Sequence, residues 1–185
     1  MTSQVYRVLA IDPGTVNLGL CVLEITKKQM SEGGLSVYSL AVHHSYTHNL
    51  KYDPFRRKQL QVLKCALDVA NGVHKDPKIT MVAVERQMRG QMLAIQAACQ
   101  MWALDHKLEC YDYHARNVKS TVGLKCCGNA QNKRNAYIIA TKLLRHPFNK
   151  GQLKSHHEAD AMLTALHCAV HMGYITTIAL KEMLQ

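Results

Sequence analysis

The sequence predicts an α/β protein whose mixed sheet begins with three antiparallel strands, continues with parallel strands and is flanked by helices. Two β-branched runs separated by a turn open the chain, and later apolar runs alternate with segments of helical period. The length of 185 residues suits one domain, and 48% hydrophobic residues are enough to form a core. We expect a single domain over residues 1–173 and a C-terminal tail over 174–185.

The antiparallel part is predicted from the turns near the N-terminus. Val5–Ile11 is a β-branched run that ends at Asp12-Pro13-Gly14, where proline presets φ and glycine accepts a positive φ. Leu18–Ile25 resumes as a strand, so the two runs form a hairpin. Ser31-Glu32-Gly33-Gly34 forms the next turn, and Leu35–Val42 is the third strand.

The remaining elements follow from changes of period. We expect helices over residues 54–73, 91–104, 136–144 and 156–172, strands over 79–84 and 108–113, and a loop over 114–132. The run 79–84 is nearly continuous in apolar residues, which is typical of a strand covered on both faces.

Positive charge is concentrated in one part of the chain. Lys and Arg number 23 against 13 Asp and Glu, a net charge of +10. Nine of these bases and none of the acids lie in residues 113–157. A solvated basic face would explain a shorter run, but an acid-free stretch of this length favours binding to a polyanion such as nucleic acid.

Several classes of protein do not fit the sequence. No apolar run approaches the ~20 residues that span a membrane, and the N-terminus has no signal-peptide pattern. The seven cysteines are scattered without a Cys-x-x-Cys pair, which favours a reduced intracellular protein. Glycine-rich nucleotide-binding motifs are also missing, so we expect no nucleotide cofactor.

Two acids end predicted strands. Asp12, before Pro-Gly, suits a turn former or a functional acid equally well. Glu85 directly follows a strand of the buried type, where an uncompensated carboxylate is costly. An ion pair with Arg86 or Arg89 is the structural alternative for Glu85, but its position favours a functional site.

A third group of polar residues opens the last predicted helix. Ser155 and Glu158 have the spacing of a capping box, which gives Glu158 a structural role. His157 and Asp160 are three residues apart, so they share one helix face. Alone, His157 would suit a first-turn polar residue, but together with the two strand-end acids the pair suggests a divalent-metal site.

These motifs resemble the RuvC-like Holliday junction resolvases of the RNase H-like superfamily. The matching segments, in order, are Asp12-Pro13-Gly14, Val82-Ala83-Val84-Glu85, Val118-Lys119, Gly128-Asn129-Ala130-Gln131-Asn132-Lys133 and His157-Glu158-Ala159-Asp160-Ala161. The stretch Glu85-Arg86-Gln87-Met88-Arg89 resembles poxvirus-type and yeast mitochondrial members. The resemblance therefore favours a large-DNA-virus type, acting in an infected cell.

The resemblance implies a metal-dependent endonuclease that resolves four-way DNA junctions by paired symmetric nicks in a homodimer. The implied metal ligands are Asp12, Glu85, His157 and Asp160, with Lys119 joining them in catalysis. Two Mg²⁺ ions per site are expected, with Mn²⁺ also accepted. The implied DNA-binding residues are Arg86, Arg89, Lys119, Lys125, Lys133 and Arg134, with Lys133 or Arg134 in the family's basic role.

The dimer contact is expected on the helix over 91–104, which is apolar almost all round, although simple burial would also explain it. Two other functions remain open at this point. One is an RNase H-like nuclease acting on other branched DNA or on RNA. The other is a non-catalytic basic DNA-binding protein whose acids serve only as caps and ion pairs.

Overall fold

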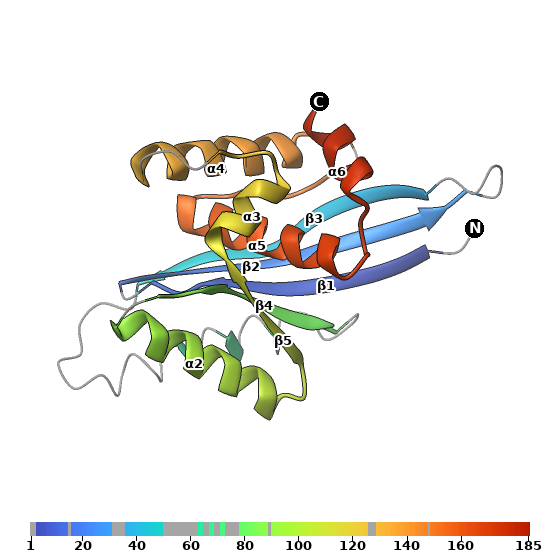
Figure 1. Cartoon of the computed structure of the whole chain (residues 1–185). Coiled ribbons are helices and arrows are strands. Elements are labelled where there is room, and N and C mark those ends of the chain that lie inside the picture. The colour runs from blue at the N-terminus through green and yellow to red at the C-terminus, as the bar shows by residue number, and fades with distance from the viewer. Residues whose placement is uncertain are drawn as a thin grey trace.

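The computed structural model describes most of the chain in one α/β arrangement (Figure 1). The described residues are 3–14, 16–30, 36–49, 63–64, 67–68, 71–72, 78–88, 90–125, 129–147 and 149–185. The strands are β1 (Ser3–Asp12), β2 (Asn17–Gln29), β3 (Ser36–Asn49), β4 (Met81–Arg86) and β5 (Glu109–His114). The helices are α2 (Gly90–Asp105), α3 (Ala115–Thr121), α4 (Asn129–Leu144), α5 (His156–His171) and α6 (Thr177–Leu184).

The strands form one mixed sheet in the order β3-β2-β1-β4-β5. β1, β2 and β3 are antiparallel neighbours, while β4 and β5 run parallel to β1. The predicted fold class is therefore confirmed. Ile11 of β1 pairs with Val84 of β4, so Asp12 and Glu85 each follow an aligned pair at the same edge of the sheet.

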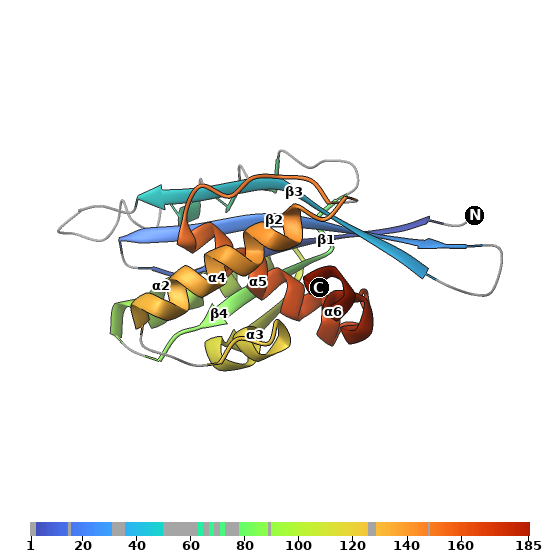
Figure 2. The same ribbon diagram turned by 90° about the horizontal axis from the view of Figure 1, so that it is seen from above.

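Helices cover both faces of the sheet (Figures 1 and 2). α3, α4, α5 and α6 pack on one face, and α2 packs on the other. β1 contributes to both cores, because Val8 and Ala10 point toward α5 while Leu9 and Ile11 point toward α2. This double burial explains why β1 is a continuous apolar run rather than an alternating one.

The structure differs from the predicted elements in several places. β3 continues to Asn49, beyond the predicted end at Val42, and α4 begins at Asn129 rather than at residue 136. Part of the expected loop over 114–132 forms α3, a short polar helix with Val118 as its single buried residue, so it has no apolar period. The expected tail over 174–185 contains α6, whose Leu180 and Met183 are buried in the main core.

Two expectations remain, the helix over 54–73 and the lack of a membrane-spanning segment. The predicted helix over 54–73 lies mostly outside the described residues, although Leu63 and Leu67 are described and buried in the core beneath α2. No helix in the described part of the chain is long and apolar enough to cross a membrane.

Candidate active site

Two strand ends bring the first pair of acids together. Parallel pairing of β1 with β4 places Asp12 and Glu85 at the same sheet edge, and each follows buried apolar residues. The buried runs hold the backbone at both positions, so the carboxylates project from a rigid support. Glu85 forms no ion pair with Arg86, which instead bonds to the Asp112 carboxylate at 2.8 and 3.0 Å. The ion pair between Glu85 and Arg86, which was the structural alternative, is therefore not formed.

The start of α5 carries the other two candidates. Ser155 is the N-cap, and its hydroxyl accepts a hydrogen bond from the Glu158 amide at 3.2 Å. The Glu158 carboxylate does not close the expected capping box on Ser155; it accepts from the Lys154 amide at 2.9 Å and from the Ser45 hydroxyl at 2.8 Å. Thr47 also donates to it, at 3.2 Å. Glu158 is only 2% exposed, and its carboxylate ties the first turn of α5 to β3.

A glycine sets the distance between β2 and α5. A Cβ atom built on Gly19 would overlap the carbonyl oxygen of His157. Gly19 is also the pairing partner of Asp12 in the β1–β2 hairpin. The missing side chain therefore lets the first turn of α5 approach the end of β1, which places His157 next to Asp12.

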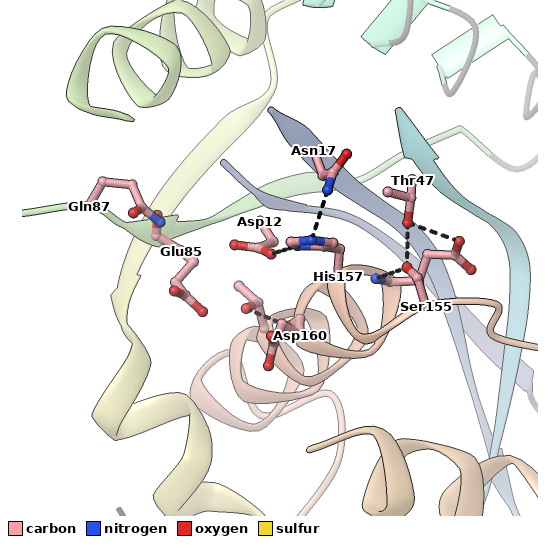
Figure 3. Close-up of polar contacts among 10 residues, drawn as sticks. Asp12, Asn17, Thr47, Glu85, Gln87, Ser155, His157 and Asp160 are labelled. Carbon is pink, nitrogen blue, oxygen red and sulfur yellow. Dashed lines mark hydrogen bonds and ion pairs between the residues drawn. The ribbon is translucent and has the colours of Figure 1, made fainter. Parts of the chain in front are cut away.

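These elements line one cleft of about 380 Å³. All four predicted metal-ligating side chains reach it from the end of β1, the end of β4 and the first turn of α5 (Figure 3). The other lining residues are Pro13, Gly14, Val16, Asn17, Gln87, Met92, Lys119 and Lys133. Two cations therefore share a small volume with three carboxylates and one imidazole.

Hydrogen bonds orient the imidazole of His157 within this cleft. Its Nδ1 lies 3.0 Å from Oδ2 of Asp12, and its Nε2 lies 3.5 Å from Nδ2 of Asn17 (Figure 3). The side chains of His157 and Asp12 are only 17% and 15% exposed. Polar partners on both ring nitrogens fix the ring plane, so His157 is more than a polar residue in a first turn.

The carboxylates of Glu85 and Asp160 are unfavourable in their ionised forms. Burial, followed by the charges of Asp12 and Asp160, raises the pKa of Glu85 to about 8, against a smaller opposing effect of Lys119. Burial and the charge of Asp12 raise the pKa of Asp160 to about 7, although Lys119, His157 and Lys133 oppose this rise. Ionising all of these carboxylates would therefore give the site more negative charge than its own lysines offset.

This donor set fits a divalent cation. In the described residues, no three His, Cys, Asp or Glu side chains are already arranged to hold a metal ion. Three partly buried carboxylates nevertheless provide hard oxygen ligands, and their repulsion when ionised is a reason to bind positive charge. A cation would lower the energetic cost that now raises the two pKa values. The residues that could hold it are Asp12, Glu85, His157 and Asp160.

The predicted basic residues are divided among several places. Lys119 and Lys133 line the cleft, whereas Arg134 lines an adjacent hollow. Lys125 is exposed after α3, and Arg86 is held in its ion pair with Asp112. Arg89, which is also predicted to bind DNA, lies outside the described residues.

Three residues at or beside the site were not identified from the sequence. Asn17 contacts His157, and Gln87 lines the cleft. Gln96 of α2 is 6% exposed and accepts from the Gln87 amide at 2.8 Å while donating to Asp112 at 3.2 Å. Gln96 could have been identified from the sequence as a polar residue within the otherwise apolar helix over 91–104.

Known structures share this arrangement. Thermus thermophilus RuvC in complex with a Holliday junction substrate superposes with a TM-score of 0.65 and 18% identity, covering 92% of this chain and 96% of that one. A second structure of Thermus thermophilus RuvC gives a TM-score of 0.63 and 19% identity, over 94% and 98% of the two chains. The fold is that of RuvC.

The similarity to RuvC is one of structure. No protein-family model matches the sequence, and no curated protein matches it. At identities of 18% and 19% the match extends over nearly the whole of both chains. The RuvC fold is thus obtained from a largely different sequence.

Proposed function

We propose that this protein is a divalent-metal-dependent endonuclease that resolves four-way DNA junctions by paired symmetric nicks in a homodimer. The observation that carries the proposal is the cleft in which three partly buried carboxylates, one imidazole and two lysines meet on a RuvC fold. Structural ion pairs do not explain this set. Asp12 pairs with His157, whereas Glu85 and Asp160 form no ion pair in the described residues and their ionised forms are opposed by neighbouring carboxylates. The segment from Glu85 to residue 89 supports a poxvirus or mitochondrial type.

Metal ions fit this proposal through the available ligands. Two Mg²⁺ or Mn²⁺ ions would be held by the carboxylates of Asp12, Glu85 and Asp160 together with the imidazole of His157. Bound there, they would activate the attacking water and stabilise the leaving oxygen of a phosphodiester.

The protein's own groups prepare the site for the phosphate. Asp12 and Asn17 orient the His157 ring from opposite sides, which reduces the rearrangement needed when the ligands assemble. Lys119 and Lys133 enter the same cleft and offset the negative charge that a phosphodiester brings and that increases in the transition state. Lys133, rather than Arg134, holds the basic role, because only Lys133 lines both the cleft and the neighbouring hollow.

The proposed substrate is junction DNA. Residues 113–157 carry nine bases without an acid. Four of these bases line the cleft or the hollow beside it: Lys119, Lys133, Arg134 and Lys154. RuvC of the same fold was captured with a Holliday junction substrate. A basic surface beside an acidic cleft suits a duplex whose backbone is held while one phosphodiester enters the site.

The outer face of α2 supports the proposed homodimer. Ile95, Cys99 and Trp102 bury one face of this helix against the sheet. The opposite face exposes an apolar stripe at helical spacing: Leu93, Ala97, Met101 and Leu104. Leu93, Met101 and Leu104 are 46%, 59% and 67% exposed. A second copy meeting this stripe would bury it and would supply the second active site that two symmetric nicks require.

The test is cleavage of a synthetic four-way junction with Mg²⁺, Mn²⁺ or EDTA, reading both strand pairs for nicks. We expect symmetric nicks with either metal and none in EDTA. Asp160→Asn should retain junction binding and lose cleavage by at least about 100-fold, because it removes a carboxylate ligand. Duplex, flap and RNA–DNA hybrid substrates distinguish junction resolution from other nuclease activities. DNA binding without metal-dependent scission would contradict an enzymatic role.

A further inference from the structure

A second hollow lies beside the cleft, between α4 and the start of α5. It has a volume of about 620 Å³. Its lining residues are Lys133, Arg134, Tyr137, Ile138, Lys154, Ser155 and His156. Lys133 belongs to both the hollow and the cleft, and the rings of His156 and His157 are 4.0 Å apart. The hollow is therefore a direct continuation of the cleft.

The hollow carries positive charge that the protein does not neutralise. None of its lining residues is acidic. Two other arginines in the described residues are paired, Arg7 with Glu24 and Arg86 with Asp112. Arg134 and Lys154 are both exposed, and neither forms an ion pair with any residue in the described ranges. Two free cations at one opening favour an anionic ligand.

The same hollow also offers apolar surface. Tyr137 donates its hydroxyl to the carbonyl of Leu153 at 3.1 Å, which fixes its ring between α4 and the segment before α5. Ile138 is 52% exposed. Arg134 lies three and four residues before these two, so all three occupy one face of α4. A fixed aromatic ring and an aliphatic side chain next to cations suit a nucleotide better than a free anion.

We propose that this hollow binds the nucleotide that flanks the scissile phosphate on the strand entering the cleft. The flanking phosphate lies between Arg134 and Lys154, and its sugar and base rest on Tyr137 and Ile138. The proposal rests on the proposed function, since it takes the ligand of the cleft to be a DNA strand. Lys133 then contacts the boundary between the two nucleotides.

Binding without chemistry tests this proposal. A fluorescent four-way junction is titrated in EDTA over 50–200 mM salt with wild type and with the double variant Arg134→Gln/Lys154→Gln. We expect binding weakened about 10- to 100-fold and the salt slope reduced in magnitude by about 2, because two phosphate contacts are lost. Lys78→Gln/Lys181→Gln is the matched control, since it removes two exposed positive charges outside both the hollow and residues 113–157. An equal loss in the control pair would overturn the proposal.

Neutral phosphates locate the contact. Junctions with single methylphosphonates are scanned along one strand against wild type, the double variant and Lys133→Gln. A methylphosphonate at the contacted position should weaken binding of the wild type but not of the variant that lacks the contact. The position found in this way with the double variant should lie within two nucleotides of the position found with Lys133→Gln. Positions on different strands, or further apart, would refute the site. This binding test does not depend on cleavage. If the protein binds the junction in this way but does not cleave it, the proposed nuclease function is contradicted and the nucleotide-binding hollow is not.

Discussion

Replacing Glu85 by glutamine should stabilise the metal-free protein, even though it removes a proposed ligand. Burial and the two neighbouring carboxylates raise the pKa of Glu85 from 4.5 to about 8. The folded state therefore keeps a proton that the unfolded chain releases above pH 4.5. The contribution of Glu85 to the free energy of unfolding thus falls as pH rises from 4.5 and is lowest above pH 8. Glutamine has nearly the same shape and never ionises.

The size of the effect follows from the pKa shift. One pKa unit corresponds to about 1.4 kcal/mol, so the shift of Glu85 sets an upper limit of about 5 kcal/mol. Rearrangement of the site and entry of water reduce this, and we expect a gain of about 2 kcal/mol at pH 8. For a chain of this size that is about 4–8 °C in melting temperature. At pH 5, where folded Glu85 is protonated, most of the gain should disappear.

The assay is thermal unfolding at pH 5 and pH 8, in EDTA and in Mg²⁺. Glu182→Gln serves as the control, because Glu182 is exposed on α6. In Mg²⁺ the order should reverse, since the wild type gains binding energy that Glu85→Gln cannot. If Glu85→Gln is less stable than wild type at pH 8 in EDTA, the electrostatic account of the cleft is wrong.

Three further changes have defined outcomes. Gly19→Ala should leave junction binding intact and reduce cleavage at least about 10-fold in single-turnover assays, because its methyl group displaces the first turn of α5; normal cleavage would contradict the close approach. Ser155→Ala should cost about 1 kcal/mol in denaturant unfolding through loss of the N-cap, whereas Ser155→Asp should restore most of it. Leu104→Glu should yield a folded monomer in sedimentation experiments, because it places a charge in the exposed stripe of α2; an unchanged dimer would exclude this face.

The sheet and the strand-end acids were predictable because their signals are local. A buried run has a distinctive composition, and a charged residue directly after it stands at the strand end, as Asp12 and Glu85 do. The spacing of His157 and Asp160 likewise fixes a common helix face before any tertiary contact is known. The structure brings all four into one cleft.

Other features depend on packing and left no clear signal. The sequence suggested that Glu158 would close a box on Ser155, but β3 supplies two hydroxyls that draw its carboxylate toward the sheet. The polar helix α3 has one buried residue, so no period could reveal it. Of the neighbours Lys133 and Arg134, Lys133 lines the cleft and Arg134 does not, and adjacent positions in a sequence do not disclose which side chain enters it.

The side-chain amide of Gln96 gives α2 an effect beyond covering the sheet. One end of this amide holds the Gln87 backbone, two residues after Glu85, while the opposite face of the same helix carries the exposed apolar stripe. A helix moves as a rigid body, so a molecule that shifts α2 also shifts the strand end that presents the acid. In the proposed dimer, a contact at the stripe would therefore act on the backbone beside Glu85 through the hydrogen bond between Gln96 and Gln87.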